Sequence, residues 1–173
     1  MLTATWLLLS MGLLGAADIV FFHTRAHRLR QHAPARGELL THALRGPTYC
    51  VLFATVPNAT FAGGWFWALL GVLAFDLAIS FADFWLEPDS RRALGGLPRG
   101  EYLLHVVLAM LFGGLVASVL HESAPTWNGP TQLTWSDAVP TWLRLLLGAM
   151  AVGVMVSGLQ DFAAVRRLPR VSR

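Results

Sequence analysis

Two segments of the chain repeat the same pairing of a carboxylate with an imidazole four residues later. Glu38 and His42 form one pair, and Glu101 and His105 form the other. Because residues four apart share one face of an α-helix, each pair would present both side chains together. Carboxylates and neutral imidazoles are ligands of iron, manganese and zinc in proteins. The spacing therefore predicts that each pair supplies ligands to a metal ion.

A third segment carries three acidic residues on one helical line. Asp76, Asp83 and Glu87 are separated by seven and four residues, which at about 100° per residue keeps them within about 20° of one another around a helix. We expect Asp83 and Glu87 to join the two Glu–His pairs as metal ligands. Asp76 lies deeper, where a carboxylate would support its neighbours or carry a proton.

His23 is the seventh predicted metal ligand, in the polar stretch that follows the first apolar segment. Asp18 lies close by, but an α-helix separates it from His23 by about 140°, so the two are not expected to share a face. Asp18 is therefore predicted to support the ligands or to relay protons without binding the metal. The residues that share this predicted role are Asp18, Asp76, Arg45, Tyr49 and Asp161.

Each of these residues also has a purely structural interpretation. Glu38 and Glu101 stand where helices are predicted to begin, and there a carboxylate stabilises free backbone amides by about 0.3–1 kcal/mol. The acids of the third segment would instead pair with Arg45, Arg91 or Arg92, as ion pairs do where a helix meets the membrane surface. The sequence leaves open whether the cluster binds metal or forms a salt-bridge network.

The segments that must position these side chains are strongly apolar. Of the 173 residues, 55% are hydrophobic and 13% charged, a composition that favours lipid over water as the surrounding medium. We predict one all-α domain over residues 1–173, an integral membrane helical bundle with about five transmembrane helices. The second is polar at its start, so the number falls to four if it is only half-inserted. The predicted spans are residues 3–22, 39–56, 61–86, 102–120 and 140–159, each near the roughly 20 residues that a bilayer requires.

The arginines indicate an orientation. If five spans alternate, all the arginines except Arg144 fall on one side of the membrane. The positive-inside rule places that side in the cytoplasm, with the N-terminus outside and the C-terminus inside. A bacterial-type plasma (inner) membrane is the expected location, and the arginines need no nucleic-acid partner to explain them.

Other chemistries find little support in the sequence. Cys50 is the single cysteine, which excludes an internal disulfide and a multi-thiolate metal site. The glycine pairs lack the spacing of nucleotide-binding loops.

Three functional hypotheses follow. The first is a metal-dependent oxidoreductase or hydrolase, with di-iron-like ligand chemistry, that acts on a lipophilic substrate and holds iron, manganese or zinc. The second is a non-enzymatic membrane subunit or small transporter, whose acids and histidines serve helix packing, proton relay, lipid binding or contact with other membrane subunits. The third is a haem b protein with His42 and His105 as axial ligands, ranked last because the nearby carboxylates would be unexplained.

Overall fold

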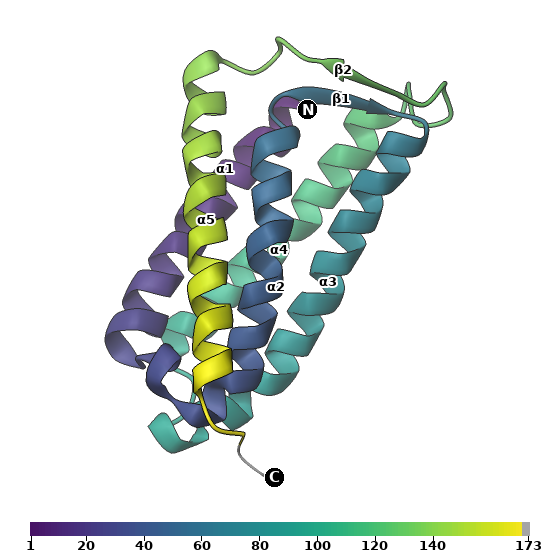
Figure 1. Ribbon diagram of the computed structural model, residues 1–173. Helices are drawn as coiled ribbons and strands as arrows, with labels where there is room; N and C mark the ends of the chain where they lie inside the picture. The colour runs from purple at the N-terminus through teal and green to yellow at the C-terminus, as the bar shows by residue number, and fades with distance from the viewer. Residues whose placement is uncertain (171–173) are drawn as a thin grey trace.

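The computed structural model describes residues 1–170 and consists mainly of five long helices (Figure 1). The first continues directly into a π-helix, and short 3₁₀ turns occupy two of the connections. Two four-residue strands complete the structure. The elements are α1 (Leu2–Asp18), the π-helix (Ile19–Ala26), 3₁₀ turns (Leu29–Gln31, Ala33–Ala35 and Arg92–Leu94), α2 (Arg36–Thr55), β1 (Ala59–Ala62), α3 (Gly64–Arg91), α4 (Arg99–Ser123), β2 (Gln132–Trp135) and α5 (Thr141–Arg167).

Four helices are long and apolar enough to cross a membrane. They cover Leu2–Ala26, Gly64–Leu94, Arg99–Ser123 and Thr141–Arg167. Among residues 1–170, α2 has a spanning length but is not one of them, because Glu38, His42 and Arg45 lower the hydropathy of its first half. The predicted all-α bundle is confirmed at this level.

The helices form two groups. α2 lies between α5 and α3, and α1 packs against α4 (Figure 1). Glycine permits the closest of these contacts: a Cβ atom built on Gly46 would lie 2.9 Å from Cα of Gly158 on α5. Small residues allow helix backbones to approach in this way. α2 also continues through Pro47, although a proline inside a helix usually bends it.

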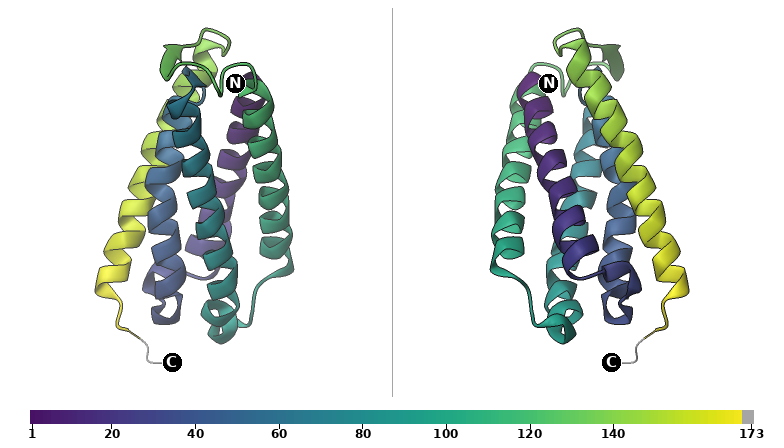
Figure 2. Two further views of the ribbon diagram at one scale, coloured as in Figure 1. Left: turned by 90° about the vertical axis from the view of Figure 1, so that its right-hand side faces the viewer. Right: turned by 90° about the vertical axis from the view of Figure 1, so that its left-hand side faces the viewer.

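The two ends of the bundle differ. The N-terminus, the start of α5 and the strands lie at one end, whereas the connection between the π-helix and α2, the connection between α3 and α4, and the C-terminus lie at the other (Figure 2). β1 and β2 pair antiparallel with Ala59 opposite Trp135. The sequence predicts only an irregular loop for residues 121–139, and it predicts that the third helix begins at Phe61, which lies in β1 instead.

Apolar packing is concentrated towards the strand end. Leu8, Leu52, Phe66, Leu115 and Leu143 are fully buried there. Many other large apolar side chains point outward, as expected for helices whose surroundings are lipid. The buried charged groups gather in the other half of the bundle, where the two helix groups are less closely packed.

Candidate metal centre

The site begins at the junction between α1 and the π-helix. His23 Nε2 lies 3.2 Å from Asp18 Oδ2, and both side chains are buried. A π-helix bonds each residue to the fifth one along, as His27 N does to Phe22 O at 2.9 Å, so residues five apart align. The prediction that Asp18 and His23 cannot share a face is therefore wrong, because it assumed a regular α-helix.

The first turns of α4 add two further groups. Glu101 Oε1 lies 3.4 Å from His23 Nε2, and His105 Nε2 lies 3.4 Å from Asp18 Oδ2. The spacing of four places Glu101 and His105 on one helix face, as predicted. Ligand-type atoms of Asp18, His23, Glu101 and His105 all lie within 4.8 Å of one another.

These separations match the edges of a metal coordination polyhedron. For bonds of about 2.1 Å, the ligand atoms of a tetrahedral site lie about 3.4 Å apart. The three distances around His23 and Asp18 are 3.2, 3.4 and 3.4 Å. Two imidazoles and two carboxylates form a donor set suited to iron, manganese or zinc. Three of the six distances within this group thus fit a metal site, and the remaining ones are at most 4.8 Å.

Several atoms in this group lack ordinary hydrogen bonds. His23 Nε2, Asp18 Oδ1 and Glu101 Oε2 are buried, and none of them has a hydrogen-bond partner among residues 1–170. Buried polar atoms are normally paired, since an unpaired one costs about 1–3 kcal/mol. Two of these atoms nevertheless lie at ion-pair distance from a neighbour: Glu101 Oε2 is 3.3 Å from His27 Nε2, and His23 Nε2 is 3.2 Å from Asp18 Oδ2. A bound cation or protonated histidines would each satisfy the carboxylates of this group.

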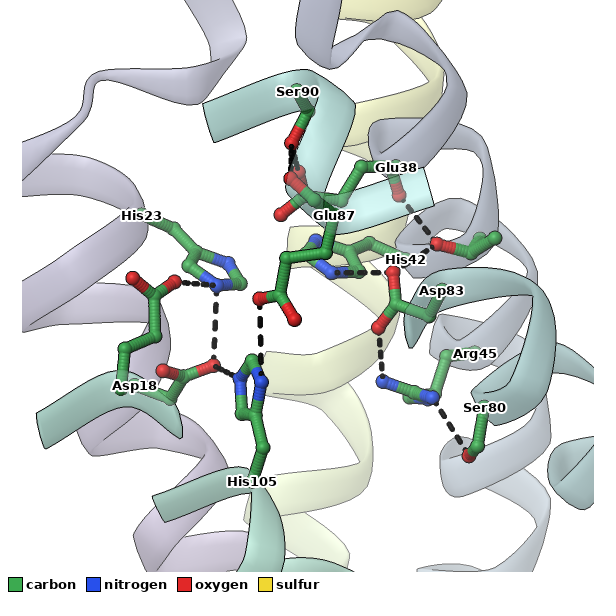
Figure 3. A network of polar contacts seen from close by, with 12 residues as sticks. Asp18, His23, Glu38, His42, Arg45, Ser80, Asp83, Glu87, Ser90 and His105 are labelled. Atoms are coloured by element: carbon green, nitrogen blue, oxygen red, sulfur yellow. Dashed lines mark hydrogen bonds and ion pairs between the residues drawn. The ribbon is translucent and has the colours of Figure 1, made fainter. Parts of the chain in front are cut away.

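Glu87 supports His105 from the far side of the imidazole. Its Oε1 lies 3.2 Å from His105 Nδ1, while His105 Nε2 faces Asp18 (Figure 3). A carboxylate behind a metal-bound histidine sets the orientation and basicity of the ring. The structure therefore places Glu87 beside His105, a candidate ligand, and Glu87 is not a member of the four-residue group. The sequence predicts that Glu87 binds the metal directly.

His42 lies next to this group and shares a second one with His23 and Glu38. The rings of His23 and His42 are stacked, with centroids 4.7 Å apart and planes inclined by 3°. His42 Nε2 also lies 3.5 Å from Asp83 Oδ1. Since His23 belongs to both groups, His42 is placed to supply a second or alternative ligand at the edge of the first.

Arg91 binds the two predicted ligands Glu38 and Glu101 together. It is fully buried, and its two terminal nitrogens lie 2.6 Å from Glu38 Oε2 and 2.6 Å from Glu101 Oε1. Ser90 also donates to Glu38. This clamp ties the starts of α2 and α4 to the end of α3. Sequence reasoning considered Arg91 only as a partner of Asp83 and Glu87, although it continues the helical line of those two residues.

A chain of polar contacts runs from Asp83 towards the middle of the bundle. Thr41 Oγ1 donates to Asp83 Oδ1 at 2.6 Å, and Arg45 Nη1 donates to Asp83 Oδ2 at 3.2 Å (Figure 3). Arg45 Nε lies 3.4 Å from Asp76 Oδ1, and Tyr49 donates to Asp76 Oδ2 at 3.2 Å. Asp83 is thus held by hydrogen bonds from α2, and Asp76 and Tyr49 lie away from the group around His23.

Asp161 has a separate partner. Its Oδ1 accepts a hydrogen bond of 2.6 Å from Arg30 Nε, and Arg30 also donates to Gln160 and Ser157 on α5. These contacts attach the connection between the π-helix and α2 to the end of α5. The structure gives Asp161 a positioning contact and does not bring it into the ligand group.

The network contains more negative than positive side chains. Its buried carboxylates number seven, but only three arginines, Arg30, Arg45 and Arg91, contact them. With all seven carboxylates ionised, four negative charges would be left for protonated histidines or bound cations to balance, because unpaired buried charge is strongly unfavourable. Protonation of a carboxylate would reduce that number. A divalent cation at the group around His23 would supply part of that balance. The seven carboxylates are those of Asp18, Glu38, Asp76, Asp83, Glu87, Glu101 and Asp161.

The ligand group faces a large, mainly apolar cavity. This cavity has a volume of about 620 Å³ and lies between the two helix groups. Its lining includes Asp18, His23 and His105 of the ligand group but not Glu101. Further polar lining residues are His42, Arg45, Asp76, Asp83 and Asp161, and apolar residues such as Phe53, Leu108 and Met150 line much of the rest. A molecule in the cavity would therefore reach the ligand group directly.

Comparison with known proteins identifies no relative of this chain. The chain matches no protein-family model, and no curated protein or solved structure is significantly similar to it.

Proposed function

We propose that the protein is a membrane-embedded metalloenzyme that acts on a lipophilic substrate. The observation that carries the proposal is the group formed by Asp18, His23, Glu101 and His105, whose ligand-type atoms lie within 4.8 Å of one another. Asp18, His23 and His105 also line the large, mainly apolar cavity. Such a position brings a substrate dissolved in lipid to the metal without passage through water.

The bound metal would supply Lewis acidity or redox chemistry for hydrolysis or oxidation. The side chains of this protein have distinct parts in that site. Asp18 and Glu101 would offset the charge of a divalent cation, His23 and His105 would complete its donor set, and Glu87 would orient His105. The stacked His42 stands beside His23, where it can accept or donate a proton together with Asp83.

Metal analysis tests the proposal directly. Protein purified without chelator is expected to contain stoichiometric iron, manganese or zinc, and His23→Ala and His105→Ala are each expected to lose it. His121→Ala is the matched control, because His121 lies on α4 but at the opposite end of the helix. Metal-free wild-type protein, or full loading of both ligand variants, would overturn the proposal.

The reaction type can be read from the products. Metal-loaded protein is incubated with a lipid extract with and without oxygen, and mass spectrometry compares the lipids before and after. Hydrolysis adds the elements of water to a substrate, whereas an oxidation depends on oxygen. We expect a change with wild-type protein and none with His105→Ala.

The main alternative is a non-enzymatic membrane subunit or transporter. The clamp formed by Arg91 with Glu38 and Glu101 favours it, because this clamp joins three helices without any metal. In that case protonated histidines balance the remaining carboxylates, and purified protein contains no stoichiometric metal. A haem b site is ranked lower still, since His42 is stacked on His23, and an optical spectrum with a Soret band would identify it.

We also propose that α2 crosses the bilayer inside the bundle and that the arginine-rich end faces the cytoplasm of a bacterial-type cell. The contacts of Glu38, His42 and Arg45 with α3 support this position for α2. In a Cys50→Ser background, Gln132→Cys should react with an impermeant thiol reagent on intact cells. Ala93→Cys should react only after lysis, and the reverse pattern would contradict this orientation.

A further inference from the structure

A second, smaller cavity lies next to the large one. It has a volume of about 190 Å³ and lies beneath the connection that leads from the π-helix to α2, where Thr24, Arg28 and Gln31 line it. Both cavities are lined by His23, His42 and Asp161. The two histidine residues therefore stand where the two cavities meet.

Arg28 gives the small cavity a cation that is not already engaged. Its neighbour Arg30 is bound to Asp161 at 2.6 Å, whereas Arg28 is exposed and has no ion pair within residues 1–170. Arg28 also has φ 48° and ψ 47°. Among residues 1–170, it is the only residue other than glycine with a positive φ. An L-residue is strained by about 1–2 kcal/mol in this conformation, and such strain tends to persist at functional sites.

The large cavity has the shape of a hydrocarbon site. It extends along α2 from His42 to Phe53 and along α5 from Met150 to Asp161, a distance of about 16 Å at 1.5 Å per residue. Phe81 lines the cavity and has 67% of its surface exposed. The cavity thus reaches the lipid-facing surface, where an aliphatic chain can enter from the bilayer.

We propose that the two cavities together bind a single-chain amphiphile with an anionic head group. Its hydrocarbon chain occupies the large cavity, and its carboxylate or phosphate binds Arg28 in the small one. Such a ligand passes the stacked rings of His23 and His42, so the carbons nearest its head group lie beside the metal-ligand group. This inference deepens the proposed function and rests on it for the reaction, although the binding itself requires no metal.

Two glycines that line the large cavity offer positions at which a larger side chain would block the site of the hydrocarbon chain. A Cβ atom on Gly15 or on Gly153 would meet no atom within 4 Å, and both residues line the large cavity. Gly15→Leu and Gly153→Leu should therefore occupy the cavity without disturbing helix packing. Gly113→Leu and Gly148→Leu are matched controls, because their Cβ atoms also meet nothing within 4 Å and neither residue lines the cavity.

The binding experiment uses the purified full chain in detergent and measures displacement of a fluorescent fatty acid. Palmitate and hexadecyl phosphate are expected to bind wild-type protein at least about tenfold more tightly than hexadecanol, because each gains a charge-assisted bond to Arg28. Inorganic phosphate and butyrate, which lack the long chain, should not displace the probe. The Gly15 and Gly153 variants should lose palmitate binding, while the Gly113 and Gly148 controls retain it.

The head-group site is tested by Arg28→Asn, since asparagine tolerates the left-handed conformation. This variant should weaken palmitate binding about tenfold and leave hexadecanol binding unchanged. Arg25→Asn is its control, because Arg25 lines neither cavity. Equal binding of palmitate and hexadecanol to wild-type protein, or unchanged binding in Gly153→Leu, would overturn the inference.

Metal content is measured on the same samples, which separates the two proposals. Metal-free wild-type protein that binds palmitate with these variant effects supports the amphiphile site and contradicts the metalloenzyme. If the protein contains metal but Gly15→Leu and Gly153→Leu leave palmitate binding unchanged, the metalloenzyme is supported and the amphiphile site is contradicted.

Discussion

His23 Nε2 lies 3.2 Å from Asp18 Oδ2 because the chain between these two residues, which are five positions apart in sequence, follows a π-helical path. An α-helix would direct the two side chains to different faces, and no ligand group could then form between α1 and α4. The local helix geometry is therefore a requirement of the candidate metal site, consistent with the frequent occurrence of π-helical turns at functional sites.

Changes in the length of this segment test its role. Inserting an alanine after Val20 increases the spacing of Asp18 and His23 from five positions to six, which aligns them in neither helix type, and metal content should fall to background. Deleting Val20 leaves a spacing of four, which an ordinary α-helix aligns, so the metal should be retained. Metal analysis of both variants checks this, and full loading of the insertion variant would show that the π-helix is irrelevant.

The contact between Glu87 and His105 predicts a graded effect on metal affinity. Glu87→Gln keeps the shape of the side chain but removes the charge behind the imidazole, so metal affinity should fall about 10- to 100-fold without being lost. Titration with a competing chelator measures this change. Asp89→Asn is the control, since Asp89 is exposed and pairs only with Arg92 among the described residues. Equal affinities for the Glu87 and Asp89 variants would argue against this role of Glu87.

Removal of Arg91 should destabilise the fold. Arg91→Ala leaves Glu38 and Glu101 buried without their shared cation, and loss of one partner from a buried ion pair costs about 3–5 kcal/mol in unfolding free energy. Arg91→Lys should recover only part of this, because a lysine cannot reproduce the two-nitrogen fork. Chemical denaturation in detergent measures the difference.

Arg92→Ala provides the comparison for that experiment. Arg92 is exposed and pairs with the exposed Asp89, and exposed ion pairs contribute about 0–1 kcal/mol. Similar losses of stability in the Arg91 and Arg92 variants would show that the buried clamp has no special structural role.

The glycine contact between α2 and α5 predicts a packing effect remote from the metal ligands. In Gly46→Ala the new methyl group would lie 2.9 Å from Cα of Gly158, which forces the helices apart and should cost about 1–3 kcal/mol. Gly148→Ala is the control, because a Cβ at that position meets no atom within 4 Å. The experiment compares the apparent melting temperatures of the Gly46→Ala and Gly148→Ala variants. A variant at Gly46 as stable as the one at Gly148 would contradict the observed packing.

Much of the architecture could be predicted because it depends on local properties of the chain. Hydropathy over about 20 residues identifies apolar helices, and helical periodicity places Asp76, Asp83 and Glu87 on one line. The same periodicity pairs Glu101 with His105. These inferences require no knowledge of how the helices pack, and the structure agrees with each of them.

Tertiary structure decided which residues form the candidate ligand group of Asp18, His23, Glu101 and His105. The insertion of Arg91 between two carboxylates and the pairing of β1 with β2 arise from contacts between segments far apart in the sequence. The switch to a π-helix after Asp18 was not predicted, because helical spacing was counted for a regular α-helix. The apolar cavity exists only because α1 and α4 are less closely packed against the other helices at one end. By itself the sequence determined which chemical groups reach that end of the bundle. Packing decided which of them meet, because the distances between side chains on different helices are set by the contacts between those helices.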